Sequence, residues 1–231
     1  MNSLPSLHLV RGLMGCCFLL ADGDNSVMID TGLFGEPLLI RRRLRRLGLQ
    51  PQSIRAILLT HGHLDHAGNL ARLKDWTGAT VYAHRAEQSH IDGSYPYEGI
   101  NRWCGRLEAA GRMLTRYRPA PIDEFLHDGQ VLPFWGGLRV VHLPGHTAGH
   151  CGFYSERHDL LFSGDMFASY FFNVHRPPAV LNSVPDKLTA SAERIRQLAP
   201  RRIVPCHLDI LDGELHRRRF ARLYAFDDWA A

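Results

Sequence analysis

The sequence lacks any run of roughly 18 apolar residues, the length that a membrane-spanning helix needs. It also lacks a regular cysteine framework, because its five cysteines are odd in number and irregularly spaced. These absences predict a protein of a reducing compartment with no membrane span, and we expect it in the cytoplasm. The 231 residues are 45% hydrophobic and 22% charged, a composition typical of one domain with a sizeable core.

Aromatic residues are absent from the strongly basic run Arg41–Arg46. Surfaces that bind single-stranded nucleic acid commonly combine basic with aromatic side chains. Apolar residues recur at helical spacing in and around this run, at Leu38, Ile40, Leu44 and Leu47. This spacing predicts a helix with one face on a core and its arginines in solvent. We therefore expect a small-molecule substrate, with no nucleic-acid or membrane partner.

What the sequence does contain is a dense cluster of metal-binding residue types. Residues 60–69 read Thr-His-Gly-His-Leu-Asp-His-Ala-Gly-Asn, so three histidines and one aspartate fall within six positions, at His61, His63, Asp65 and His66. Imidazole and carboxylate groups are preferred ligands of zinc and related first-row metals. The cluster follows the strand-like run 55–59, which places these side chains on one loop.

Three more residues of these types stand where apolar, strand-like runs end. His146 follows residues 138–143, Asp165 follows residues 160–163, and His207 follows residues 203–206. Loops held by a rigid scaffold commonly carry chemistry. The segment Asp30-Thr-Gly ends an earlier strand-like run in the same way, either as a plain turn or as a contact to a ligand. Cys206, beside His207, is expected to point away from the metal into the core.

The order of these residues closely resembles the metallo-β-lactamase superfamily, from about Phe18 to His207. The resemblance implies an α/β fold, a four-layer αββα sandwich with the metal site at one edge of the two sheets. It also implies two adjacent divalent ions, zinc foremost, with iron or manganese as alternatives. The implied ligands are His61, His63 and His146 for the first ion, Asp65, His66 and His207 for the second, and Asp165 as a bridge.

With an aspartate at position 165, the chain resembles the glyoxalase II, lactonase and phosphodiesterase branches of that superfamily. The resemblance thus implies a dinuclear hydrolase in which a metal-bridging hydroxide attacks a small ester, thioester or lactone. Asp65 is the predicted catalytic residue, which would pass a proton to the leaving group. Asp30, Thr60 and Thr147 are predicted to support the ligands from behind, and His150 is predicted to be structural.

Other functions remain open at this point. Persulfide dioxygenases share the fold and bind a single iron through two histidines and one aspartate; here these would be His61 or His63, with His146 and Asp165. A phosphodiesterase or nuclease is a further alternative, and so is a metal-binding protein without catalysis.

The sequence predicts a single domain over residues 1–231 with a helical insertion at about 85–130. The aromatic residues of the insertion could line a substrate pocket, form a homodimer contact or make a small separate core. The predicted pocket residues are Tyr97, Trp103, Tyr170 and Phe171. The predicted strands are Leu7–Val10, Cys16–Ala21, Ser26–Asp30, Arg55–Thr60, Thr80–Ala83, Leu138–Leu143, Gly152–Ser155, Leu160–Ser163 and Arg202–Pro205. The predicted helices are Glu36–Leu47, Gly68–Trp76, Asn101–Tyr117, Pro185–Ala199 and Gly213–Phe226.

Overall fold

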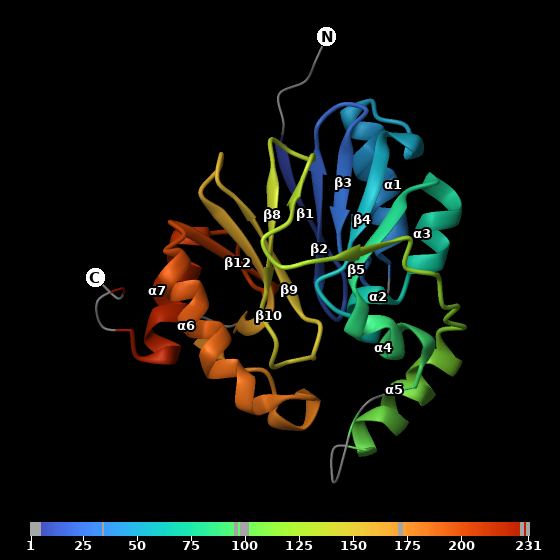
Figure 1. The fold of residues 1–231 in the computed structure, drawn as a ribbon. Helices are drawn as coiled ribbons and strands as arrows, with labels where there is room; N and C mark the ends of the chain where they lie inside the picture. Colours follow the sequence, from blue (N-terminus) through green and yellow to red (C-terminus); the bar gives the residue numbers. More distant parts are fainter. Residues whose placement is uncertain are drawn as a thin grey trace.

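Two β-sheets lie face to face at the centre of the molecule, and helices cover both outer faces (Figure 1). The computed structural model describes residues 6–33, 35–94, 97, 102–170, 173–226 and 229. The first sheet has the order β1 (Ser6–Arg11), β2 (Cys16–Ala21), β3 (Ser26–Ile29), β4 (Ile54–Leu58), β5 (Thr80–His84) and β6 (Glu124–Leu126). Its last four strands run parallel to one another.

The second sheet has β10 near its middle, paired with β9, β11 and β12. Its strands are β7 (Val131–Leu132), β8 (Leu138–His142), β9 (Cys151–Ser155), β10 (Leu160–Tyr170), β11 (Asn173–His175) and β12 (Arg202–Leu208). Among the described strands of this sheet, only the β10–β12 pair is parallel.

The helices of the first half are α1 (Glu36–Leu47), α2 (Leu64–Ala67), α3 (Leu70–Thr77), α4 (Gln88–Asp92) and α5 (Arg102–Leu114). The second half has α6 (Leu188–Leu198) and α7 (Gly213–Tyr224). Short 3-10 turns are η1 (Pro51–Ser53), η2 (Arg85–Glu87), η4 (Ala179–Leu181) and η5 (Pro185–Lys187). Within the part of the chain that the structure describes, no helix has the length and apolar character to cross a membrane.

Three apolar clusters hold these layers together. Between the sheets lie side chains of both, including Phe18, Phe153 and Phe162. One outer cluster packs the first sheet on α1 and α3, and the other packs the second sheet on α6 and α7. Strand β2 is apolar throughout. Its alternate side chains point to opposite faces of the sheet, and both faces are covered. The predicted αββα sandwich is confirmed.

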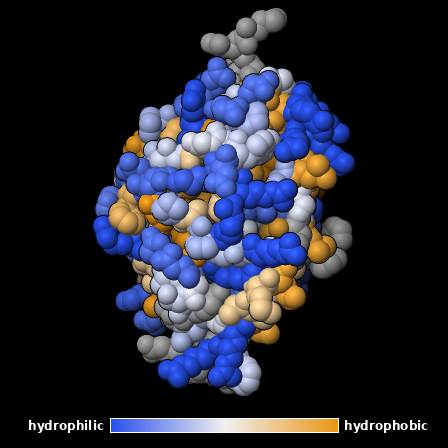
Figure 2. Space-filling view, turned by 90° about the vertical axis from the view of Figure 1, so that its right-hand side faces the viewer, coloured by the Kyte–Doolittle hydropathy of each residue, from blue (hydrophilic) through white to orange (hydrophobic). Residues whose placement is uncertain are grey.

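Helix α1 has the predicted bounds, since its signals are local. Gly48 ends it in the left-handed conformation, and Ile40 and Leu44 are buried. The prediction for Leu38 was wrong: its side chain is 51% exposed, because it lies outside the stripe that faces the sheet. The arginines of the run are largely exposed, and hydrophilic side chains dominate this side of the molecule (Figure 2).

Several predicted bounds differ from the structure. Strands β10 and β12 continue past their predicted ends, and the short strands β6, β7 and β11 were not predicted. The predicted helix at Gly68–Trp76 begins earlier, as α2, and resumes as α3. The region at 85–130 holds α4, α5 and β6, and Asn101, the predicted start of α5, lies outside the described residues.

Candidate metal centre

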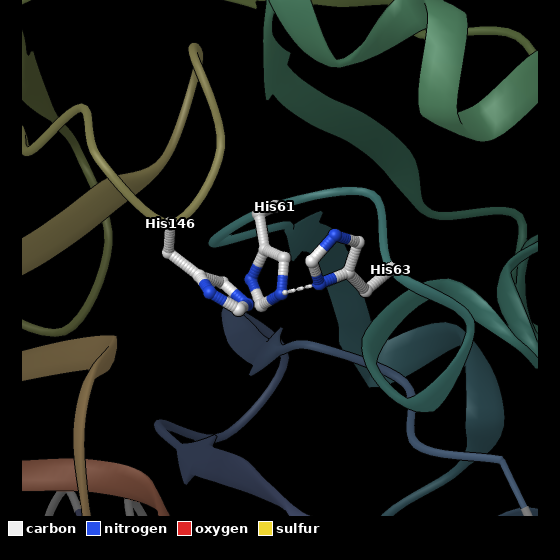
Figure 3. A group of neighbouring side chains, drawn as sticks. All are labelled: His61, His63 and His146. Atoms are coloured by element: carbon white, nitrogen blue, oxygen red, sulfur yellow. Dashed lines mark hydrogen bonds between the residues drawn. The ribbon is translucent and has the colours of Figure 1, made fainter. Parts of the chain in front are cut away.

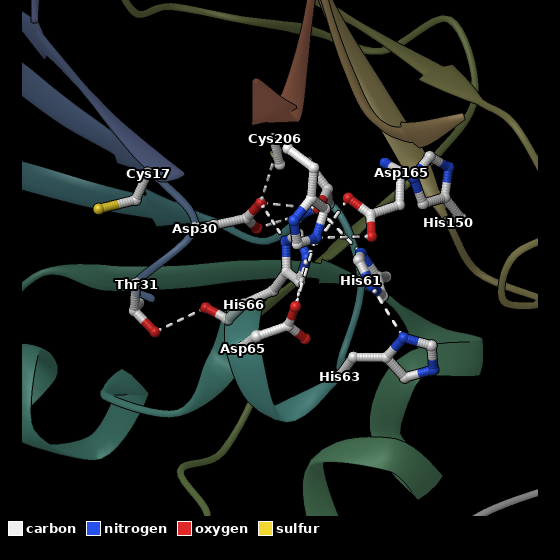
Figure 4. A network of polar contacts seen from close by, with 12 residues as sticks. Cys17, Asp30, Thr31, His61, His63, Asp65, His66, His150, Asp165 and Cys206 are labelled. Carbon is white, nitrogen blue, oxygen red and sulfur yellow. Dashed lines mark hydrogen bonds and ion pairs between the residues drawn. The ribbon is translucent and has the colours of Figure 1, made fainter. Parts of the chain in front are cut away.

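The seven predicted ligand residues meet at one edge of the two sheets. Figure 4 labels five of them, His61, His63, Asp65, His66 and Asp165. Strands β3 and β4 are parallel, as are β10 and β12, so each pair delivers its carboxyl ends to the same side. Ligand sites in α/β proteins commonly form outside such strand ends. The loop after β4 and helix α2 supply four of the residues. The other three come from the loop after β8, the middle of β10 and the end of β12.

The first group consists of His61, His63 and His146 (Figure 3). Their candidate ligand nitrogens lie within 4.8 Å of one another, and all three side chains are buried. Nε2 of His61 lies 3.1 Å from Nδ1 of His63. His146 approaches from the other sheet, so this group joins the two halves of the sandwich.

The second group consists of Asp65, His66 and His207. Oδ2 of Asp65 lies 3.3 Å from Nε2 of His207 and 3.6 Å from Nε2 of His66. Asp165 lies between the two groups: its carboxylate oxygens are 3.1 Å from His207 Nε2, 3.4 Å from His66 Nε2 and 3.6 Å from His146 Nε2. The position of Asp165 is therefore that of a shared ligand.

Each of the five imidazoles is anchored through its outward nitrogen. Four partners are His61 Nδ1 with Thr60 Oγ1 at 3.0 Å, His63 Nε2 with Tyr97 Oη at 2.7 Å, His66 Nδ1 with Asp30 Oδ2 at 2.9 Å, and His146 Nδ1 with Asn182 Oδ1 at 2.9 Å. The fifth is His207 Nδ1 with Tyr170 Oη at 3.0 Å. Such partners fix the tautomer and orientation of metal-binding imidazoles. The other nitrogen of every ring is thereby left facing the centre.

The inward atoms fit divalent metal ions. Nε2 of His66, Nε2 of His146 and Oδ1 of Asp165 are buried and make no hydrogen bond to the described residues. Buried polar atoms without a partner are costly, so each requires an explanation. A set of five imidazoles and two carboxylates is the donor chemistry that zinc and iron accept.

The electrostatics of the two groups differ. Burial and neighbouring imidazoles lower the pKa of His61 and of His63 well below the usual value, which favours the neutral form that binds metal. Burial also disfavours the charged form of His66 and of His207, but Asp165 and Asp65 outweigh it and hold the pKa of both well above the usual value. The second group thus attracts positive charge.

Asp165 is aimed by a bulge in β10. The pairing of β10 with β12 shifts register on both sides of Gly164, and bulges of this kind re-aim side chains. Gly164 has a φ of 54°, and a Cβ there would lie 2.4 Å from Nε2 of His150. The same Nε2 accepts a hydrogen bond of 2.9 Å from the backbone N–H of Asp165. His150 is therefore structural, as predicted.

Asp30 lies behind the second group and has a left-handed backbone, with a φ of 58°. Its carboxylate accepts hydrogen bonds from the backbone N–H and the hydroxyl of Thr60, both at 2.8 Å. The thiol of Cys206 points to the same carboxylate at 3.2 Å and away from the centre. Asp30 and Thr60 thus contact candidate ligands. Thr147 is buried, but its hydroxyl makes no hydrogen bond to a described ligand residue.

Comparison with known proteins agrees with this geometry. The sequence profile of the metallo-beta-lactamase superfamily matches residues 10–207. The chain belongs to this superfamily. The predicted resemblance is therefore confirmed.

One relative within the metallo-beta-lactamase superfamily is the hydroxyacylglutathione hydrolase GloC of Haemophilus influenzae, 30% identical over 152 residues. The match covers 65% of this chain and 65% of that protein, so the chain spans slightly less than two thirds of its length.

Two solved structures are also similar. The family protein TTHA1429 of Thermus thermophilus superposes with a TM-score of 0.72 at 24% identity, over 96% of this chain and 79% of that one, and it shows the fold. TTHA1623, solved in a di-iron-bound form, has a TM-score of 0.66 at 29% identity, over 89% of this chain and 92% of that one.

This member of the metallo-beta-lactamase superfamily also contains a support that sequence reasoning missed. Glu87, at the end of η2, is fully buried. One oxygen accepts the backbone N–H of Gly62 and the other accepts that of Gly149, both at 2.7 Å. Gly62 lies between His61 and His63, and Gly149 lies in the loop of His146. One carboxylate therefore joins the two loops of the first group. No local motif marks Glu87, because its partners are distant in sequence.

The predicted pocket residues separate into different roles. Tyr97 lines a cavity of about 400 Å³ together with His63 and Asp65. Tyr170 instead contacts His207. Trp103 is 63% exposed, lies against Arg106 and is outside the cavity wall. Phe171 lies outside the described residues. A homodimer contact through residues 85–130 stays a prediction.

Proposed function

We propose that this chain is a hydrolase that binds two divalent metal ions and cleaves a small ester, thioester or lactone. The observation that carries the proposal is the arrangement of the five imidazoles. Each is anchored on its outer side by a residue of another segment or by its chain neighbour, and the second nitrogens gather in two adjacent groups. Asp165 approaches members of both groups, His146 in one and His66 and His207 in the other. The name of the relative GloC supports an acyl substrate.

The ligands follow the two groups. His61, His63 and His146 would hold one ion, and Asp65, His66 and His207 the other, with Asp165 shared. When bound, such ions lower the pKa of water toward about 7 and polarise the bond to be cleaved. Zinc is the first candidate, with iron and manganese as alternatives.

Asp65 is the proposed proton carrier. It is the acid of the two groups that also lines the cavity, and its side chain is 26% exposed. Its carboxylate can take one proton from the attacking water and give it to the leaving oxygen or sulfur. The acyl carbon gains the water oxygen and loses its bond to the leaving group, which departs with that proton.

Elemental analysis of the protein purified without added metal is the first test. We expect close to two metal ions per chain, falling by about one in His66→Ala, because that substitution removes a ligand of one group only. His127→Ala is the matched control, since His127 is exposed and outside both groups. Hydrolysis of an ester, thioester and lactone panel should then decline in a metal-loaded Asp65→Asn variant.

A different metal count would point to the alternative chemistry. One iron per chain that His66→Ala leaves in place would overturn the dinuclear hydrolase. Oxygen uptake with persulfide substrates would then test a mononuclear iron dioxygenase. Unchanged turnover of fully metallated Asp65→Asn would remove the proposed role of Asp65 alone.

A further inference from the structure

The cavity beside the metal groups has an unusually apolar wall. It measures about 400 Å³, and the metal-group residues His63 and Asp65 are part of its lining. Helix α5 forms one side and the turn between β1 and β2 contributes to another. The lining residues are Met14, Leu33, His63, Leu64, Asp65, Tyr97, Cys104, Leu107, Glu108, Gly111, Leu114, Thr115 and Leu181. Cavities of this size with few polar groups are typical small-molecule sites.

The apolar character extends to the mouth of the cavity. Leu107 is 72% exposed, Leu114 is 80% exposed and Met14 is 51% exposed. Large apolar side chains this exposed carry a hydration cost that a bound apolar group would relieve. They come from two separate segments, α5 and the β1–β2 turn, that both border the cavity.

The described part of this wall has no positively charged lysine or arginine side chain. Its acids are Asp65 and Glu108. Arg112 of α5 is close by, but its guanidinium donates to Glu108 at 3.3 Å and to the carbonyl of Ile91 at 2.9 Å. Arg102 and Arg106 border a neighbouring pocket, which adjoins the cavity at Tyr97, and neither arginine is part of the cavity lining.

We propose that the substrate carries an uncharged, apolar arm on one side of the scissile bond, and that this arm lies along α5. The proposal rests on the hydrolase function above and narrows its substrate class. A substrate arm with free carboxylates, such as the glutathione part of a hydroxyacylglutathione, finds two acids and no cation along the described lining of this cavity. An aliphatic chain finds leucine, methionine and cysteine side chains.

Two neutral substrate series test the proposal. One extends the acyl chain of N-acetylcysteamine thioesters from acetyl to decanoyl, and the other extends the alcohol of acetate esters over the same range. We expect kcat/KM to rise in one series, by up to about fourfold per methylene while the chain stays inside the cavity. Glutathione thioesters of the same acyl groups should be hydrolysed at least about tenfold less efficiently.

A pair of variants on one helix locates the effect. Leu107→Asp places a charge at the mouth of the cavity, and Met113→Asp places the same charge on α5 outside the lining. Both positions are more than 70% exposed, at 72% and 77%, so neither substitution should unfold the protein. The chain-length preference should fall in Leu107→Asp and remain in Met113→Asp. Leu114→Asp is a second test of the same wall.

Binding of decanamide, measured by the shift in melting temperature, tests this proposal independently of the hydrolase function. Binding to the wild type and to Met113→Asp, with loss in Leu107→Asp, supports the apolar site even if no ester is cleaved. The proposal is overturned if decanamide does not bind. It is also overturned if active enzyme shows no chain-length dependence in either series, or prefers glutathione thioesters. Absence of all hydrolysis with decanamide bound would instead reject the hydrolase function.

Discussion

At the scale of single residues, the site depends on partners that lie behind the ligands. Asp30 is one example, because its carboxylate contacts both Thr60 and His66. Glu87 is another, because it holds two loops through backbone N–H groups. Neither residue belongs to the two ligand groups, but each orients ligand side chains or the loops that carry them. Their substitution should therefore alter metal retention as well as stability.

Replacing Glu87 by glutamine tests whether its carboxylate holds the loops of Gly62 and Gly149 together. The amide nitrogen would face a buried backbone N–H of Gly62 or Gly149, and an unsatisfied buried donor costs about 1–3 kcal/mol. At roughly 2–4 °C per kcal/mol for a domain of this size, the melting temperature should fall by several degrees. A chelator should also remove metal faster. Glu124→Gln, at an exposed carboxylate, is the control. An unchanged melting temperature and chelation rate would show that Glu87 does not stabilise the two loops.

Tyr170→Phe tests a partner of the second group. The substitution removes only the hydroxyl that contacts Nδ1 of His207. Loss of a partner of this kind typically costs about 10–100-fold in metal affinity or activity. Metal affinity is measured by competition with a chelating dye. Tyr154→Phe, whose hydroxyl donates to Asp159 instead, should bind metal normally. Equal affinity in Tyr170→Phe would mean that His207 is oriented by its strand alone.

At the scale of elements, local signals explain what the sequence could predict. Helix α1 was predicted completely because its glycine end and its apolar spacing lie within the helix itself. Strand β10 was predicted only as far as Ser163, since glycine and aspartate at 164 and 165 are unfavourable in strands. Pairing with β11 and β12 overrides that preference and extends the strand to Tyr170.

The candidate site divides in the same way. The order of its seven ligand-type residues is readable from the sequence, because each follows an apolar run. Asp30 and Thr60 were also predicted as supports, and they contact His66 and His61. Other supporting contacts were not predicted: Asn182 is 36 residues from His146, and Tyr97 is 34 residues from His63. Glu87 has no marker either, since its partners are backbone groups 25 and 62 residues away. Contacts between distant segments depend on the assembled fold.

One buried arginine connects helix α5 to neighbouring segments. Arg112 donates to the carbonyl of Gly62, in the loop of the first group, and to those of His90 and Ile91. It also pairs with Glu108. Arg112→Met should destabilise the protein by about 1–3 kcal/mol, because it leaves the carbonyls of His90 and Ile91 without their donor.

Hydrogen exchange shows which segments lose stability in Arg112→Met. Amides of α5 and of residues 88–92 should exchange faster in Arg112→Met, whereas β2 and β10 should change only with global stability. Arg106→Met is the matched control on the same helix, since Arg106 is exposed and contacts Trp103. Protection of α5 that equals the wild type would mean that apolar packing alone holds the helix.

At the scale of the whole molecule, the site connects the two halves of the sandwich. One half supplies the loop after β4 and helix α2, and the other supplies the loop after β8 and strands β10 and β12. None of the seven candidate ligands belongs to the apolar cluster between the sheets, in which the Phe18 and Phe162 rings lie 5.2 Å apart. The fold should therefore survive removal of the metals, with reduced stability at this edge.

Removal of the metals by a chelator, followed by stepwise return of zinc, tests this division. The metal-free protein should still unfold cooperatively, because the core does not involve the ligands. Its melting temperature should rise as zinc is added, since a ligand at about 100 times its Kd adds about 2.7 kcal/mol. That gain corresponds to roughly 5–11 °C for a domain of this size. His66→Ala should keep only part of the rise, because the group with His61, His63 and His146 is intact.

A metal-free protein that melts at the same temperature as the zinc-loaded one would show that the ions do not join the two sheets. A metal-free protein that is unfolded would show that the core between the sheets is insufficient without them.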